Sequence, residues 1–594
     1  MQKSYLEKSS NFNKLPVVEV ESHLYQVVNG WEAICSRLNN EVTAISRKKK
    51  LVVIETYQGV IHEELISNLK NGFHHTHLIS AEDFYLSEED IKKLVFPDVT
   101  NDRIFGFLSR LTINDFFCPE KVASVKAEIE SAEEGVILIY GTGAAYLCPD
   151  PDLLVYADMA RWEIQTRMRK HLVDNLGVKN RDTPDWMLLY KQGFFVDWRV
   201  CDRLKKTLYD QWDFLLDTNK ISEPKLIEGM AVLEGLKLAV HRPFSVVPFF
   251  DPGPWGGQWM KEVCNLDPLV ENYGWCFNCV PEENSLLLKF GNDVIEVPSI
   301  NLVFRYPKEL LGDSVYGRFG DEFPIRFDFL DTMNGGNLSL QVHPLTAYIQ
   351  DKFGMHYTQD ESYYIMDAED DAIVFLGLCD DVKPELMIAE LKEAQAGGKP
   401  FNAGKHVKRW PVKKHDHVLV PAGTVHCSGK DSMVLEISAT PYIFTFKLWD
   451  WGRMGLDGKP RPINIEHGKN VIQWDRTESW VKKNLLNCVK KVAEGDGWTE
   501  EHTGLHESEF IETHRHWFTE KVYHKTNGSV NVLNLVEGRE AIVESPMRSF
   551  KPFIVHYTET FIIPEAVGEY TIRPYGESEG CKCATIKAFV KHNV

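Results

Sequence analysis

The 594-residue sequence has no uninterrupted apolar run of about 18 residues, the length that a transmembrane helix requires. The stretch MQKSYLEKSSNFNKLP at residues 1–16 contains neither an apolar core nor a cleavage site, so we expect no signal peptide. The chain also lacks an excess of positive charge: 86 Asp and Glu outnumber 66 Lys and Arg, which gives a formal net charge of −20. Duplex nucleic acid and anionic membranes need a basic surface, and both are therefore poor candidates for partners.

Cysteine is scattered: twelve residues lie mostly inside apolar runs such as FFCPE and LLNCVKK. This distribution favours reduced thiols and a cytoplasmic location over a disulfide framework. Cys276 and Cys279 form one Cys-x-x-Cys pair, with no second pair at zinc-ribbon spacing. We interpret them as two buried strand thiols, with a redox or metal pair as the alternative.

The chain is too long for one core, so several domains are expected. Before about residue 225, short apolar strands alternate with helical patterns, which predicts an α/β domain with a mostly parallel sheet. Strands are expected at 50–57, 135–143 and 152–158, and helices at 62–70, 120–134 and 159–177.

After about residue 230 the sequence becomes short strands separated by Gly, Pro and Asp turns, which predicts an all-β region of barrels or sandwiches. One helical insertion is expected at 383–398. Residues 415–429 and 558–572 share one plan of strand, Pro-containing turn and strand, but His426 of the first unit corresponds to Glu569 or Tyr570 of the second. We therefore expect two small barrels, of which only the first can bind a metal.

Metal-type side chains occur in three separate strand segments. In GGNLSLQVHP, Gln341 and His343 share one strand face, because side chains alternate along a strand. Glu361 lies in QDESYYIMDA and His426 in VPAGTVHCSG. Two imidazoles, a carboxylate and an amide oxygen fit Zn²⁺ best, with Fe, Mn, Co or Ni as alternatives. Taken alone, each residue could equally be an ordinary strand residue, and Gln341 and His343 could belong to a solvated edge strand.

The turn before His426 has its own signature. Pro421 suits position i+1 of a type I turn and Gly423 suits position i+3, which would place His426 at the start of a strand.

The all-β region resembles class I mannose-6-phosphate isomerases of the cupin superfamily over residues 240–594, most densely at 321–467. The motifs that carry the resemblance are PWGGQWM, EFPIRFDFLDTMNGGNLSLQVHP, DESYYIMDA, VPAGTVHCSGKDSMVLEIS, TFKLWDWGR, GKPRPINIEH and IIPEAVGEYTI. The resemblance implies a double cupin of jelly-roll barrels.

The same resemblance implies Zn²⁺ bound by Gln341, His343, Glu361 and His426. It also implies a sugar phosphate substrate and interconversion of mannose 6-phosphate and fructose 6-phosphate. That reaction moves a proton between C1 and C2 through an enediol.

Three positions depart from the family pattern. Asp328 in FPIRFDFLDT replaces a lysine that faces the site, Gln359 replaces the lysine of Lys-Thr-Glu, and Lys447 in TFK replaces an arginine. A phosphosugar and its enediolate both favour cations. Asp328, Lys447 and Arg453 are therefore the candidate catalytic residues, and Arg326 and Lys459 are further candidate cations. The alternative is an altered cupin that binds a sugar or sugar phosphate as a regulatory protein.

The first 225 residues resemble P-loop nucleoside kinases of the uridine kinase type, through KLVVIETYQG, GVILIYGTG and DLLVYADMARWEIQTRMRK. However, QGVIHEELISNL replaces the Gly-x4-Gly-Lys-Ser/Thr loop, so the amide cradle and the phosphate-binding lysine are missing. We predict a degenerate kinase-like α/β domain at 1–228 that acts as scaffold, sensor or oligomer contact, a metal-binding cupin at 229–480 and a metal-free cupin at 481–594. A working kinase is the weaker alternative, and the oligomeric state stays open.

Overall fold

The computed structural model describes residues 5–21, 24–441, 443–454 and 461–591. It divides into two compact units: residues 17–238 with 285–305, called here the α/β unit, and residues 1–16, 239–284 and 306–594, called the double-barrel unit. Across the described residues, no helix combines the length and the apolar character that crossing a membrane would need. The three domain boundaries expected from the sequence remain predictions.

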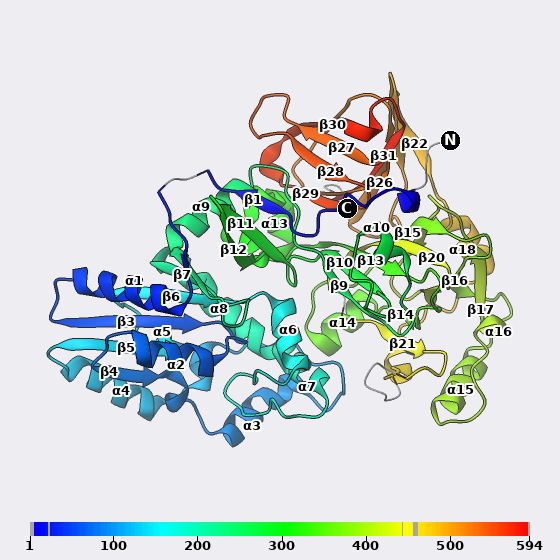
Figure 1. The fold of residues 1–594 in the computed structure, drawn as a ribbon. Helices are drawn as coiled ribbons and strands as arrows, with labels where there is room; N and C mark the ends of the chain where they lie inside the picture. The colour runs from blue at the N-terminus through cyan, green and yellow to red at the C-terminus, as the bar shows by residue number, and fades with distance from the viewer. Residues whose placement is uncertain (1–4, 22–23, 442, 455–460, 592–594) are drawn as a thin grey trace. The chain divides into compact units, whose positions relative to one another are not determined.

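The α/β unit is built on a seven-stranded sheet (Figure 1). Its strand order is β2 (Val28–Asn29), β8 (Lys225–Glu228), β7 (Phe214–Asp217), β6 (Leu153–Asp158), β3 (Lys49–Thr56), β5 (Gly135–Gly141) and β4 (His77–Ser80). The five strands from β7 to β4 are parallel, whereas β8 and β2 are added in antiparallel pairs. Val53 of β3 and Val155 of β6 are both fully buried, as expected for parallel strands covered on both faces.

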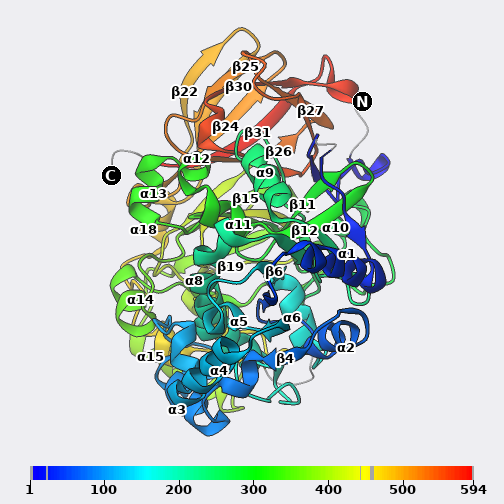
Figure 2. The same cartoon turned by 90° about the vertical axis from the view of Figure 1, so that its left-hand side faces the viewer.

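Helices of the same unit pack around this sheet and around a second, smaller sheet (Figures 1 and 2). They are α1 (Trp31–Ala44), α2 (His62–Gly72), α3 (Glu88–Val99), α4 (Pro119–Ser131), α5 (Ala144–Leu147), α6 (Arg161–Arg169), α7 (Trp186–Gln192), α8 (Trp198–Leu208), α9 (Gly229–Ala239) and α11 (Ile300–Arg305). The single helix predicted over 159–177 is wrong in length, because α6 ends at Arg169. His171 then has a φ of 56°, in the left-handed region that a continuing helix cannot contain. A separate small sheet joins β1 (Val17–Glu19), β11 (Ser285–Phe290) and β12 (Asp293–Pro298).

The double-barrel unit begins with a barrel of two antiparallel sheets. One has the order β18 (His417–Val420), β15 (Glu361–Ala368), β20 (Ser432–Ala439), β13 (Ile325–Asp331), β10 (Trp275–Cys279) and β9 (Phe249–Asp251). The other has the order β17 (Val407–Pro411), β16 (Ile373–Leu378), β19 (His426–Ser428), β14 (Leu340–Val342) and β21 (Phe446–Trp449). The helical insertion predicted at 383–398 is present as α15 (Pro384–Gln395).

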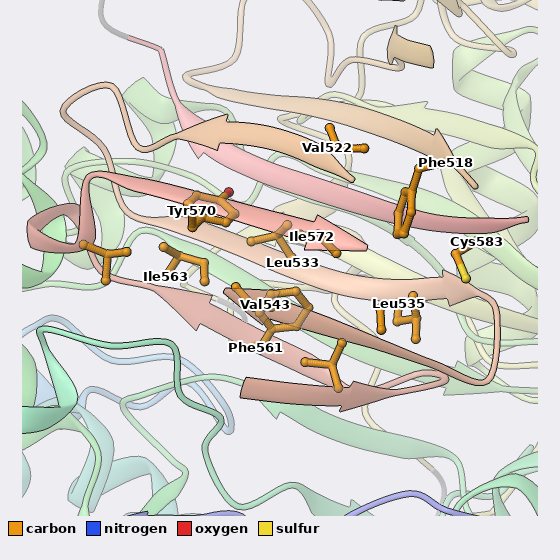
Figure 3. Packing of buried hydrophobic residues seen from close by; sticks show 13 residues of the cluster. Phe518, Val522, Leu533, Leu535, Val543, Phe561, Ile563, Tyr570, Ile572 and Cys583 are labelled. Atoms are coloured by element: carbon orange, nitrogen blue, oxygen red, sulfur yellow. The ribbon is translucent and has the colours of Figure 1, made fainter. Parts of the chain in front are cut away.

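The second barrel of this unit also consists of two antiparallel sheets. One runs β22 (Lys490–Gly495), β23 (Trp498–His502), β24 (Ile511–Phe518), β31 (Cys583–Val590), β26 (Asn531–Glu537) and β29 (Thr560–Ile563), and the other runs β25 (Val522–Lys525), β30 (Glu569–Pro574), β27 (Glu540–Glu544) and β28 (Phe553–His556). Their inner faces meet in an apolar core that includes Leu533, Phe561 and Tyr570 (Figure 3). Tyr570 donates a hydrogen bond of 2.8 Å to Asn531 Oδ1, so its hydroxyl is satisfied inside the core.

The core of the second barrel predicts a large cost for truncating Phe561, whose side chain is fully buried. Phe561→Ala is expected to destabilise the double-barrel unit by about 3–5 kcal/mol, because the lost apolar contacts leave a cavity. Ile554→Ala, on the preceding strand β28 of the other sheet and 40% exposed, is the matched control and should change stability by less than about 1 kcal/mol. Denaturant unfolding followed by tryptophan fluorescence measures both, and equal effects would contradict this description of the core.

All twelve cysteines are free thiols. Cys276 and Cys279 lie in β10 and are fully buried, and burial raises the pKa of both thiols well above the usual range. Because thiolates are the reactive and metal-binding form, this environment supports buried strand thiols over a redox pair.

Candidate metal centre

Three of the four predicted metal ligands lie together inside the first barrel. His343 follows β14, Glu361 begins β15 and His426 begins β19, and all three are fully buried. Glu361 Oε2 lies 3.1 Å from His343 Nε2, and Glu361 Oε1 lies 2.8 Å from His426 Nε2. One candidate ligand atom from each residue lies within 4.8 Å of the others, so the group could hold a metal ion. Burial opposes ionisation of Glu361, but with both imidazoles protonated the two histidines outweigh burial and hold its pKa well below the usual range.

Backbone carbonyl groups orient both imidazoles. His426 Nδ1 lies 2.8 Å from the carbonyl oxygen of Thr424, and His343 Nδ1 lies 3.4 Å from that of Phe444. A carbonyl oxygen can only accept, so these contacts place the proton of each neutral ring on Nδ1. The lone pair of each Nε2 then faces Glu361. Such a contact on the far nitrogen is the usual way in which proteins orient metal-binding histidines.

Two buried polar atoms of this group have no hydrogen-bond partner in the part of the chain that the structure describes, although buried polar atoms normally have one. His343 Nε2 and Glu361 Oε1 are inaccessible to solvent and have no hydrogen-bond partner among the described residues. Unsatisfied buried polar atoms are costly and uncommon, and a cation between them would use both lone pairs. Two imidazole nitrogens and a carboxylate form a donor set typical of divalent transition ions. The residues present therefore fit a divalent metal.

The fourth predicted ligand, Gln341, lies beside the cluster. In β14 it is the cross-strand partner of both His426 in β19 and Lys447 in β21, so these side chains share one face of the sheet. Its Nε2 lies 3.3 Å from His426 Nε2. A ligand role needs the amide oxygen to face the ion instead, so this role stays a prediction.

The turn that positions His426 differs from the predicted type I turn. The amide of Gly423 donates to the carbonyl of His343 at 2.9 Å, and that of Thr424 donates to Pro421 at 3.1 Å. Pro421 is therefore residue i, and Gly423 occupies position i+2 with a φ of 88°. Predicting Pro421 at i+1 was wrong, because the turn begins one residue later. Glycine is needed at 423, since an added Cβ would lie 2.9 Å from the carbonyl oxygen of Val471.

Asp328 lies inside the same barrel with a cation beside it. Arg326 and Asp328 are two residues apart in β13 and therefore share a face, and Arg326 Nε lies 3.2 Å from Asp328 Oδ1. Arg326 also pairs with Glu436 of β20, and both Arg326 and Asp328 are at least 95% buried. Burial raises the pKa of Asp328 to about 7, although Arg326 opposes this shift. Arg326 therefore places a positive charge two residues from 328, paired with the carboxylates of Asp328 and Glu436. The alternation of side chains along the strand FPIRFDFL could have predicted that Arg326 and Asp328 share one face.

Gln359, which replaces another expected lysine, acts as a hydrogen-bond donor to the buried carboxylates. Its Nε2 lies 2.9 Å from Glu361 Oε2 and 3.2 Å from Glu436 Oε1. It therefore fixes the rotamer of Glu361 without adding charge.

A group of cations surrounds Asp450, next to β21. Asp450 Oδ1 lies 2.7 Å from Arg453 Nη2, and its Oδ2 lies 3.0 Å from Arg461 Nε. Burial lowers the pKa of Lys447 to about 7, with Arg461 and Arg453 acting in the same direction and Asp450 opposing them. Arg461 was missed as a candidate although it lies in the motif GKPRPINIEH, whereas the candidate Lys459 lies outside the described residues.

Arg453 is held in place by further contacts. Its Nη1 donates a hydrogen bond of 2.6 Å to the carbonyl of Asn337, and its guanidinium lies 5.5 Å from the ring centre of Trp255. The structure thus brings Lys447, Arg453 and Arg461 into one cationic group, and places Asp328 in a separate ion pair.

Comparison with known proteins covers both parts of the chain. Residues 30–241 match a family model described as a domain of unknown function, DUF8485. A mannose-6-phosphate isomerase from Streptococcus mutans is 27% identical over 245 residues, which are 40% of this chain and 72% of the relative. The isomerase ManA of Bacillus subtilis is 26% identical over 232 residues, 39% of this chain and 68% of the relative. The crystal structure of a Bacillus subtilis mannose 6-phosphate isomerase has 19% identity and a TM-score of 0.48, covering 58% of this chain and 99% of that one. Part of this chain is therefore similar in sequence to mannose-6-phosphate isomerases.

Proposed function

We propose that the double-barrel unit is a metal-dependent aldose–ketose isomerase that converts mannose 6-phosphate, or a related sugar phosphate, to its ketose. The observation that carries this proposal is the buried cluster of His343, Glu361 and His426, in which both Nε2 lone pairs face one carboxylate. The names of the relatives support the substrate class. We propose Zn²⁺ as the ion, with Gln341 as a fourth ligand.

The ion, when bound, polarises sugar oxygens and stabilises negative charge on them. The chain supplies the remaining requirements. Backbone carbonyls hold the two imidazoles in the metal-binding tautomer, and Gln359 holds Glu361. Arg453, together with Lys447 in its protonated form, supplies positive charge for a phosphate or an enediolate. Asp328 acts as a positioning residue that keeps Arg326 inside the barrel.

Metal analysis and an isomerase assay on the same purified sample test this proposal. About one divalent ion per chain is expected, together with conversion of mannose 6-phosphate to fructose 6-phosphate. A chelator should abolish this conversion and added Zn²⁺ should restore it. Protein that is fully metal-loaded but converts no mannose 6-phosphate would contradict the isomerase proposal for that substrate.

A second candidate function is a regulatory protein that binds the sugar phosphate without converting it. The observation that favours it is the carboxylate of Asp328, which replaces a cation inside the barrel. In that case mannose 6-phosphate should raise the unfolding temperature of the metal-loaded protein with no turnover.

For the domain organisation of the whole chain we propose a degenerate P-loop kinase-like domain at 1–228, a metal-binding cupin at 229–480 and a metal-free cupin at 481–594. The central position of β3 among parallel strands supports the first of these assignments. Without the glycine-rich loop, ATP binding by residues 1–228 is expected to be undetectable.

A further inference from the structure

The α/β unit contains a cavity of about 660 Å³, a volume within the usual range for small-molecule sites. Gln58 after β3, Glu82 after β4 and Thr142 after β5 line it, so it lies outside the carboxyl ends of three adjacent parallel strands. The chain leaves β3 toward the β4 edge of the sheet and leaves β6 toward the β7 edge, although β3 and β6 are neighbours, so the switch point adjoins the cavity at Gln58. Ligands of open parallel sheets bind at such switch points.

A row of hydrogen bonds leads from the cavity wall into the sheet. Glu82 Oε1 lies 2.7 Å from His62 Nδ1, and His62 Nε2 lies 3.1 Å from Thr56 Oγ1. Thr56 Oγ1 in turn lies 3.1 Å from Thr142 Oγ1. Glu82 accepts a hydrogen bond from His62 Nδ1–H, so Nε2 of the neutral ring accepts one from the Thr56 hydroxyl. The Thr56 oxygen in turn accepts a hydrogen bond from the Thr142 hydroxyl. A lone pair of the Thr142 hydroxyl then remains for a donor group in the cavity.

The backbone amides best placed to bind an anion beside the cavity already have a partner. Gly143 and Ala145, at the start of α5, donate to the two carboxylate oxygens of Glu55 at 2.7 and 2.8 Å. Glu55 is 1% exposed, so this carboxylate is an internal substitute for an external anion. A phosphate group would have to displace it.

The charges that line the cavity also disfavour phosphate. Arg181 lines the cavity but is already bound to Asp174 at 2.7 Å and to Glu63 at 3.0 Å. Among the described residues, the second cation that lines the cavity is Lys179, which is exposed. Against these two cations stand five lining carboxylates: Glu63, Glu82, Glu88, Asp174 and Asp182. A phosphorylated ligand would therefore meet a net negative wall.

The remaining wall is neutral. The amides of Gln58 and Asn175 and the hydroxyl of Tyr85 are already hydrogen-bonded within the protein, and Tyr85 and Tyr140 add aromatic rings. We propose that this cavity binds a neutral polyhydroxylated ligand, a sugar without a phosphate group, with Thr142 accepting a hydrogen bond from a sugar hydroxyl. The α/β unit is then a binding module for an uncharged carbohydrate. This inference does not depend on isomerase activity in the double-barrel unit.

Hydrogen exchange of the full-length protein, read by mass spectrometry, tests the proposal with D-mannose, D-glucose, D-fructose and mannobiose, and with the three monosaccharide 6-phosphates. Neutral sugars are expected to protect amides at 57–66 and 172–182, and each monosaccharide should do so at lower concentration than its 6-phosphate. Protection around 341–361 would report the double-barrel unit instead, which keeps the two sites distinguishable.

Thr142→Val removes the accepting hydroxyl and should weaken protection by neutral sugars about 3- to 10-fold, the loss of one hydrogen bond. His62→Gln is the second variant if Thr142→Val does not fold, and it should weaken binding similarly by breaking the row. Thr43→Val, at an exposed position of α1, is the matched control and should change nothing. The proposal is overturned if no neutral sugar protects 57–66 and 172–182, if the 6-phosphates protect them better, or if the variant that folds binds like the wild-type protein.

Discussion

His426→Ala is expected to weaken binding of a divalent ion by at least about 100-fold, so that purified protein carries almost none. The substitution removes one of three buried donors, and even partners of metal ligands commonly contribute about 10- to 100-fold to affinity. Metal content by mass spectrometry after gel filtration measures the loss. Isomerase activity, if present in the wild-type protein, should fall with it.

A matched control separates metal loss from general destabilisation. His406 is another buried histidine of the double-barrel unit, 2% exposed, and its Nε2 lies 2.6 Å from Glu390 Oε2. His406→Ala should lower the unfolding temperature but leave the metal content unchanged. The assignment of His426 as a ligand fails if the two variants retain equal amounts of metal.

Two features of the candidate metal ligands could be predicted from the sequence. Alternation puts Gln341 and His343 on one face, and the turn before His426 starts a strand there. Their convergence could not be predicted in this way. Glu361 belongs to a different sheet from Gln341 and His426, and only closure of the barrel brings these strands face to face. The resemblance to a known family supplied that information, not the spacing.

Among the contacts around the cluster, too, those within one strand could be predicted from the sequence and those between distant strands could not. The pairing of Arg326 with Asp328 follows from their positions two residues apart on one strand, and could have been anticipated. The contact of Arg326 with Glu436 joins residues 110 positions apart and depends on the register between β13 and β20. The domain fold of residues 17–238 was likewise anticipated in class, but the cavity at the ends of its strands depends on long-range strand order.

Removing the Arg326 guanidinium should be the most destabilising charge change in the first barrel. Arg326→Met leaves Asp328 and Glu436 buried without their cation, and breaking a buried ion pair from one side typically costs about 3–5 kcal/mol. Denaturant unfolding of the double-barrel unit measures the loss. Lys469→Met, a partly exposed cation paired with exposed Glu466, is the control and should cost less than about 1 kcal/mol.

The double variant Arg326→Leu with Asp328→Lys tests whether the cation has simply moved along β13. The new lysine stands on the same strand face as the lost arginine, within the group that contains Glu436 and Glu361. A cation is thereby kept among the buried carboxylates, so the double variant should lose less than half the stability lost by Arg326→Met. It also restores the charge pattern that the isomerase resemblance implies, and any turnover of mannose 6-phosphate should rise. Equal destabilisation of the two variants would show that the guanidinium geometry at 326, and not the presence of positive charge, is what the barrel requires.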